Sequence, residues 1–219
     1  MLTATYTLVA LSVEQASLRL NLLAFQKYIH GTLRQQNSMT LGQLEYACDG
    51  LNRLYEACHW RKIDIYLIPA LRQLTGQADR LLDELNHLNQ GALAILRQLQ
   101  AHGDGMADQG EEAVTRLGVG VDAFCAALLQ RLDREEAELF AIARRALGGD
   151  VWLTLASQFW RHDAEVEERR RHARGPAALK LAPPPAATAA EATLSDPAVL
   201  ADAAAGVQPA PRLALTLAG

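Results

Sequence analysis

Apolar residues recur along most of the chain at intervals of three and four, which is the period of one face of an α-helix. Such spacing predicts a first helix with Leu11, Leu18, Leu22, Phe25, Ile29 and Leu33 on one face. It predicts three more long helices, from about Thr40 to Leu74, from Leu81 to Leu99 and from Val121 to Ile142. A short fifth helix, which Asp150 can cap, follows with Trp152, Leu155, Phe159 and Trp160. The pattern therefore predicts an all-α protein, an antiparallel up-and-down four-helix bundle over residues 8–172.

The composition changes near Gly175. Seven of the eight prolines fall between Pro176 and Pro211, in a segment rich in Ala that contains no Trp, Tyr or Phe. Such a segment cannot bury enough apolar surface to offset the entropy lost on ordering. We therefore expect residues 175–219 to form a flexible, disordered Ala/Pro-rich tail, either an inert extension or a tether.

Charge and cysteine content exclude several classes of protein. The 21 basic and 25 acidic residues give a net charge of -4, which argues against a nucleic-acid partner. No run reaches the roughly 18 consecutive apolar residues of a membrane span, and the first six residues lack the basic region of a secretory signal. The three cysteines, Cys48, Cys58 and Cys125, form no CxxC pair and are expected to be buried free thiols. We expect a cytoplasmic protein with no membrane partner.

Two polar residues interrupt the apolar faces of the predicted helices. Gln15 lies in line with Leu11 and Leu18, and Glu135 lies in line with Leu132. A buried carboxylate is costly unless it is paired or binds a metal, and the interiors of helical bundles are where metal sites assemble. Glu135 therefore indicates either a metal site or a structural polar network in which it pairs with Arg131, one turn earlier.

Two segments carry a family resemblance. His59–Leu71, HWRKIDIYLIPAL, resembles the second-helix motif H-H-x-K-E-D-E-x-L-F-P-x-L of hemerythrin-like, HHE cation-binding proteins. Arg131–Phe140, RLDREEAELF, resembles their fourth-helix motif H-x-x-x-E-E-x-x-L-F-P. Glu14-Gln15 occupies the place of the first-helix E-H, and residues 150–159 are similar to a W-x-x-(I/L)-A segment that follows the fourth helix. The resemblance covers about residues 8–165 and implies a bundle that holds two irons on histidine and carboxylate ligands.

This sequence departs from that ligand set. The resemblance places Gln15 at the first-helix histidine, Ile63 at the second-helix glutamate and Arg131 at the fourth-helix histidine. His59 and Glu135 are kept, and either His87 or Leu88 falls at the third-helix ligand position. The remnant metal ligands are therefore His59, His87 and Glu135, which could hold a single iron in a two-histidine, one-carboxylate arrangement.

A fixed guanidinium repels a dication at close range, so we predict that an arginine-centred cluster of Gln15, His59, Arg131 and Glu135 replaces the metal. The expected protein is a divergent hemerythrin-like bundle with no cofactor and no enzymatic activity, in a structural, regulatory or partner-binding role with an unknown protein partner. One alternative holds one iron or a non-standard site and acts in oxygen, nitric oxide or iron sensing or storage. Another is an enzyme that uses Glu135 and His59 as an acid/base pair.

Overall fold

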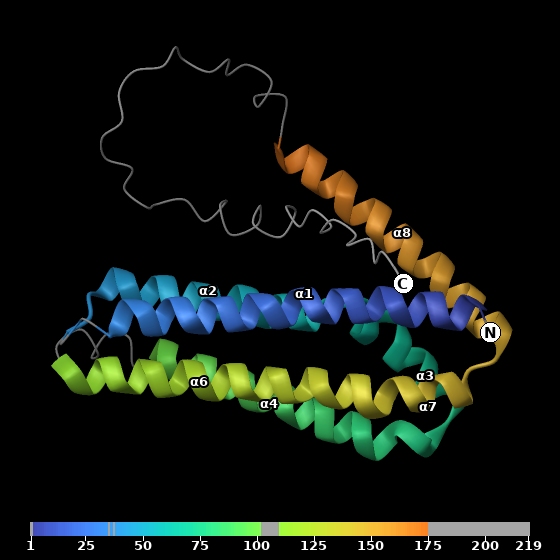
Figure 1. Cartoon of the computed structure of the whole chain (residues 1–219), viewed down its shortest axis with the longest axis horizontal. Coiled ribbons are helices and arrows are strands. Elements are labelled where there is room, and N and C mark those ends of the chain that lie inside the picture. Colours follow the sequence, from blue (N-terminus) through green and yellow to red (C-terminus); the bar gives the residue numbers. More distant parts are fainter. Residues whose placement is uncertain (1, 35, 37, 102–109, 175–219) are drawn as a thin grey trace, which may run out of the picture. The chain divides into compact units, whose positions relative to one another are not determined.

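The computed structural model describes residues 2–34, 36, 38–101 and 110–174, and its regular structure there is helical, with no β-strand in those ranges (Figure 1). The α-helices are α1 (Leu2–Leu33), α2 (Leu41–His59), α3 (Ile68–Leu74), α4 (Asp79–Ala101), α6 (Gly110–Arg134), α7 (Phe140–Ala146) and α8 (Gly149–Arg174). Two π-helical segments, η1 (Ile63–Leu67) and η3 (Glu135–Leu139), precede α3 and α7, and a 3-10 turn, η2 (Gly76–Ala78), precedes α4. The all-α prediction is confirmed. The predicted disordered tail, residues 175–219, lies outside the described residues.

The predicted helix boundaries need three corrections. The second predicted helix is α2, η1 and α3 in succession, and the fourth is α6, η3 and α7. The first helix already begins at Leu2, because its N-terminal residues are apolar or carry Thr hydroxyls that the helix accommodates, as Thr7 does by donating to the Thr3 carbonyl. The fifth helix is not short. It runs for 26 residues and begins at Gly149, so that Asp150 lies within its first turn, where a carboxylate complements the helix dipole.

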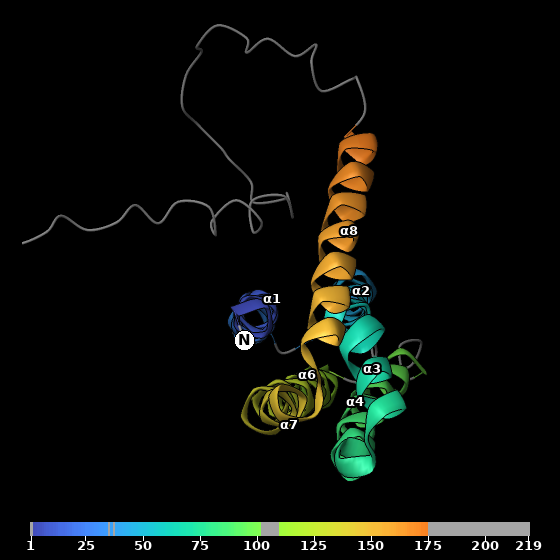
Figure 2. The same ribbon diagram turned by 90° about the vertical axis from the view of Figure 1, so that its right-hand side faces the viewer.

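The long helices lie side by side (Figure 1). α1 packs against α2 and α6, and α4 packs against the same two helices, so that the four elements surround a common interior. Viewed along the molecule, α8 crosses at one end, where it packs on α1 and η1, and its C-terminal part rises away from the other helices (Figure 2). That part carries a run of charged residues between Glu165 and Arg174.

The apolar interior consists of two clusters that occupy opposite ends of the helices. The first fills the end formed by the C-terminal half of α1, α2, the C-terminal half of α4 and α6, with Leu22, Leu51, Leu96 and Phe124 at its centre. The second lies under α8, among the N-terminal half of α1, η1, α3 and α7. All three cysteines are buried and free, as expected. The level between the two clusters is polar.

By length and composition, α1 is long and apolar enough to cross a membrane, with an 18-residue window of mean hydropathy 1.3. Only 28% of that window is buried, although Leu11, Leu18 and Leu22 on one face belong to the core. α1 therefore combines a core face with an uncovered apolar face.

The contact between α1 and α2 depends on a glycine. A Cβ atom at Gly50 would overlap the ring of Phe25, whereas a Cβ at Gly91 of α4 would meet no atom within 4 Å. We predict that Gly50→Ala lowers the free energy of unfolding by about 1 to 2 kcal/mol, since overpacking outweighs the gain in helix propensity. Gly91→Ala should raise it by about 0.5 to 1 kcal/mol. Urea denaturation followed by circular dichroism measures both, and equal shifts in the same direction would contradict the prediction.

Candidate functional site

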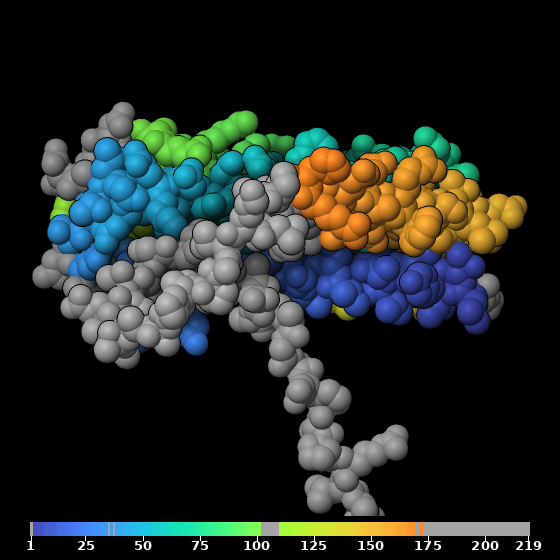
Figure 3. Space-filling view, turned by 90° about the horizontal axis from the view of Figure 1, so that it is seen from above, coloured from blue at the N-terminus to red at the C-terminus, as the bar shows by residue number. Residues whose placement is uncertain are grey.

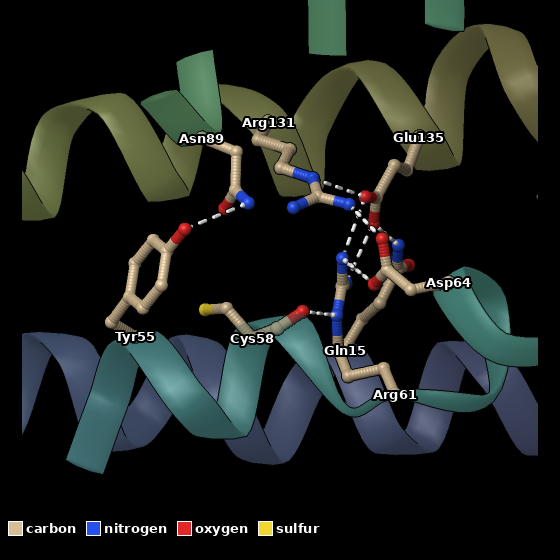
Figure 4. Close-up of polar contacts among 8 residues, drawn as sticks. All are labelled: Gln15, Tyr55, Cys58, Arg61, Asp64, Asn89, Arg131 and Glu135. Atoms are coloured by element: carbon tan, nitrogen blue, oxygen red, sulfur yellow. Dashed lines mark hydrogen bonds and ion pairs between the residues drawn. The ribbon is translucent and has the colours of Figure 1, made fainter. Parts of the chain in front are cut away.

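Each long helical segment contributes to both apolar clusters and carries a buried polar residue at the level between them. These residues are Gln15 on α1, Arg61 after α2, Asn89 on α4, and Arg131 with Glu135 at the junction of α6 and η3. All are at most 5% exposed. Figure 4 shows that they point toward one another across the interior. The charge cluster, defined as Gln15, Arg61, Asp64, Arg131 and Glu135, lies at this level.

The Glu135 carboxylate is the centre of the charge cluster (Figure 4). Its Oε2 atom accepts from Gln15 Nε2 at 2.9 Å and from Arg61 Nη1 at 2.7 Å. Its Oε1 atom accepts from Arg61 Nη2 at 2.7 Å and from Arg131 Nε at 2.9 Å. A carboxylate has about four acceptor positions. The four donors therefore saturate Glu135, and the bidentate pairing with Arg61 fixes its plane.

Asp64 supplies the second negative charge. It accepts from Arg61 Nη2 at 3.1 Å and from Arg131 Nη2, so that each guanidinium joins both carboxylates. Asp64 is 15% exposed and forms the edge of the charge cluster nearest solvent. Two guanidinium groups and two carboxylates carry no net charge, which reduces the cost of placing them between two apolar clusters.

The arginines determine the protonation state of the cluster. Burial alone would raise the pKa of Glu135, but the charges and hydrogen bonds of Arg61 and Arg131 outweigh it and hold that pKa below its ordinary value. Burial alone would lower the pKa of Arg61, and the charge of Glu135 raises it instead. Burial raises the pKa of the neighbouring Cys58 thiol to about 11. Glu135 is therefore ionised at neutral pH and the Cys58 thiol is neutral. Burial raises the pKa of Asp64, against the opposing charges of Arg131 and Arg61.

A break in the second helix positions Arg61. α2 ends at His59, and Trp60 leaves helical geometry with φ -93° and ψ 27°. Carbonyls in the last turn of a helix lack continuing helical donors. The Cys58 carbonyl in that turn accepts from Arg61 Nε at 2.8 Å, which directs the guanidinium inward. The π-helical segment η1 then begins at Ile63. On the opposite side of the cluster, the second π-helical segment, η3, begins at Glu135. Such segments are often found at functional sites.

The predicted arginine-centred cluster is brought together in part. Gln15, Arg131 and Glu135 lie in mutual contact through Glu135. His59 does not join them, and this part of the prediction is corrected. The His59 ring is exposed, stacks on Tyr55 at a centroid distance of 6.2 Å and meets Trp60 edge-on at 5.5 Å. The physical reason is that the apolar face of α2 runs through Leu51 and Cys58, about 100° from His59.

The third-helix position holds neither of the two expected residues. His87 is exposed and lines a surface groove with Leu88 and Arg134. The inward polar residue of α4 is Asn89, four residues after buried Leu85, and its Nδ2 donates to the Tyr55 hydroxyl at 3.4 Å. The three predicted remnant ligands, His59, His87 and Glu135, are therefore not gathered around one point.

Sequence reasoning missed Arg61 and Asp64. A signal for them exists in the spacing, because Arg61 follows buried Cys58 by three residues and Asp64 follows Arg61 by three. The motif that His59–Leu71 resembles obscured the signal for Arg61, which falls at its variable position x, whereas Asp64 matches the D of that motif. Arg61 supplies two of the four hydrogen bonds to Glu135 and is the larger omission.

The side chains of the charge cluster do not offer the ligand atoms that iron or another divalent cation would need. In the part of the chain that the structure describes, no group of three or more His, Cys, Asp or Glu side chains is placed to hold a metal ion. The acceptor positions of Glu135 are filled, and two permanent cations stand beside it. Ile63, for which the resemblance predicted the place of a ligand glutamate, is fully buried in the second apolar cluster. Among the described residues, the buried oxygens without a partner in the cluster and beside it are the amide atoms Gln15 Oε1 and Asn89 Oδ1 and one carboxylate oxygen, Glu14 Oε2. Burial raises the pKa of Glu14, and Lys62 and Arg61 oppose that shift.

Comparison of the sequence with protein-family models and with curated proteins, and of the structure with solved structures, finds no match.

We predict that Arg61→Met and Arg131→Met each lower the free energy of unfolding by about 3 to 5 kcal/mol, because each strands a buried carboxylate. Arg134→Met is the matched control, since Arg134 pairs with Glu138 at 2.8 Å near the surface of the same helical segment. Its loss of stability should be much smaller. Urea denaturation at pH 7 measures all three, and a neutral Arg61→Met would show that Glu135 is solvated.

We also predict a specific pH dependence. Because the pKa of Glu135 is lower in the folded than in the unfolded chain, its stabilisation is complete above the unfolded value of about 4.3 and disappears as the pH falls through the folded value. The stability difference between the wild type and Glu135→Gln should therefore shrink as the pH falls below about 4.3. Chemical denaturation from pH 7 to pH 3 measures it. Glu45→Gln, on the exposed side of α2, is the control, and a constant Glu135 difference would refute the prediction.

Proposed function

We propose that this chain is a divergent hemerythrin-like protein, an antiparallel four-helix bundle whose charge cluster takes the place of a metal centre. Its role is structural, regulatory or partner-binding, and it is not an enzyme. The proposal is supported by the order of the two motifs along the chain and by the position of the charge cluster at the level where those motifs meet.

The observation that carries the proposal is the saturation of Glu135 by four hydrogen bonds from Gln15, Arg61 and Arg131. A metal ligand needs a free lone pair, and a cation at this point would have to displace two guanidinium groups. Because displacement would leave buried cations unpaired, it is opposed by several kcal/mol of desolvation, on the order of the cost of breaking a buried ion pair.

The same contacts argue against acid–base catalysis by Glu135. A general base needs a pKa near the working pH and access to a substrate proton. The arginines hold the pKa of Glu135 low, and its side chain is 0% exposed. His59, the other member of the hypothetical pair, lies on the surface.

A structural role follows from how the cluster joins the helices. Its hydrogen bonds connect α1, the segment after α2, and the α6–η3 junction, and Arg61 and Arg131 each donate to both carboxylates. A buried polar layer of this kind fixes the register of helices, since sliding any one of them leaves charges unpaired. We infer that the cluster holds the bundle in a single arrangement and so fixes the outer surfaces that partners meet.

The metal content of protein produced in iron-rich medium tests the proposal. We predict fewer than about 0.1 iron per chain by elemental analysis and no iron-dependent absorbance between 300 and 400 nm. Glu135→Ala and the surface variant Glu138→Ala should be equally free of iron. Two irons per chain, or a single iron lost in Glu135→Ala and kept in Glu138→Ala, would overturn the metal-free centre, and the second outcome would establish the one-iron alternative.

A further inference from the structure

α1 has an apolar face that no other described element covers. The outer stripe of α1 is defined as Leu2, Tyr6, Val9, Val13, Ala16, Leu20, Leu23 and Lys27. Its six large apolar side chains are between 45% and 90% exposed, and Ala16 is exposed as well. The core face of the same helix, with Leu11, Leu18 and Leu22, points in nearly the opposite direction. A helix that is apolar on both faces is expected to be covered on both.

The spacing of the outer stripe is that of a coiled coil. Its members alternate strictly by four and three residues from Leu2 to Lys27, which is the seven-residue repeat of a helix that packs along another helix. Over this span the helix is about 38 Å long, enough for a seam of several layers. The seam is narrow, because polar residues such as Ser17 and Asn21 lie exposed beside it.

We propose that the outer stripe of α1 is a homodimerisation surface, on which α1 of a second copy of this chain packs in antiparallel orientation. The proposal names the partner for the binding role given above and rests on that role, but it does not depend on the metal-free centre.

The outer stripe is complementary to the outer stripe of a second copy that runs in the opposite direction. In antiparallel register, Tyr6 faces Leu23 of the second copy, Val9 faces Leu20, and Val13 faces Ala16. These three layers are apolar, the outermost layer sets Leu2 against Lys27, and the smallest side chains meet at the centre, where the two helices cross. A two-fold interface requires such self-complementarity. A parallel pair would instead place Lys27 against Lys27, with like charges facing each other.

Charge favours a second copy over a membrane surface. Between Leu2 and Gln26, α1 carries only two charged residues, Glu14 and Arg19. Arg19 pairs with Asp133 of α6 at 2.5 Å, and Glu14 is half-buried, so neither belongs to the stripe. Helices that lie on membranes carry Lys and Arg beside a broad apolar face. Two identical uncharged stripes, in contrast, meet without electrostatic repulsion.

The apolar surface continues from the stripe onto α8. Tyr6 lines a groove of about 660 Å³ together with Leu153 and Trp160, which are 57% and 80% exposed. α1 and α8 lie next to each other on this face (Figure 3). In the antiparallel register, residues 19–23 of the second copy pass the α1 side of this groove, which enlarges the interface at both ends of the seam.

Sedimentation equilibrium of the full chain from low to high micromolar concentration tests the proposal. The wild type should reach twice the chain mass of 23.8 kDa. Val13→Glu should raise the dissociation constant at least about tenfold, because the seam would bury an unpaired carboxylate. Val119→Glu is the matched control, since Val119 on α6 is 63% exposed and Val13 is 64% exposed. It should leave the dimer intact, and far-ultraviolet circular dichroism should show both variants folded.

Disulfide cross-linking tests the orientation. The three native cysteines are buried, so introduced surface thiols report the interface. The double variant Tyr6→Cys/Leu23→Cys should form cross-linked dimers on mild oxidation, whereas Tyr6→Cys and Leu23→Cys alone should not. Efficient cross-linking of either single variant would overturn the antiparallel pairing.

Two further outcomes would overturn the proposal as a whole. The first is a wild type that remains monomeric at all concentrations. The second is a monomeric chain that floats with phosphatidylcholine/phosphatidylglycerol vesicles and loses this binding in Val13→Glu, which would assign the outer stripe to a lipid surface. Neither outcome changes the iron content, so failure of the dimer and failure of the metal-free centre are distinguished.

Discussion

The pairing of the Glu135 carboxylate with two guanidinium groups is the interaction on which the arrangement of the helices depends. Glu135 is fully buried between two apolar clusters, where an unpaired charge would be prohibitively costly. Arg61 and Arg131 make that burial tolerable, and Asp64 neutralises the charge that the second arginine would otherwise leave in excess. Because each of the four groups needs the others, the cluster acts as a unit, and removing one member costs more than its share of the hydrogen bonds.

Breaks in regular helical geometry place the side chains of the charge cluster in the interior. α2 ends just before Arg61, and the carbonyl of Cys58 in its last turn accepts from Arg61 Nε. π-helical segments begin at Ile63 and at Glu135, on the two sides of the cluster. An uninterrupted second helix would bring a different set of residues to the interior. The departures from regular helix thus decide which charges meet. The exposed rings of His59 and Trp60 lie beside the half-buried ring of Tyr55.

The inner and outer faces of α1 differ in what they contact. Gln15 on the inner face donates to Glu135 and joins α1 to the charge cluster, while Arg19 anchors its flank to α6. The outer stripe contributes nothing to that interior. α1 is therefore held in place on its inner face and carries a regularly spaced apolar stripe on its outer face. Such a helix presents a preformed surface to another molecule. Preformed surfaces lose little entropy on binding.

The sequence by itself determined the helical class, the positions of the long helices and the burial of Gln15, Arg131 and Glu135, because apolar periodicity and interruptions of that periodicity are local properties of the chain. Only the tertiary structure added Arg61 to the partners of Glu135. Arg61 reaches Glu135, and Asp64 reaches both arginines, because α2 stops at His59. His59 lies on the exposed side of α2, about 100° from Cys58, and Asn89 rather than His87 faces inward because α4 is oriented by its packing on α2 and α6. Apolar periodicity determines which side of a helix faces the interior. Which charged side chains pair across that interior is determined only by how the helices pack against one another.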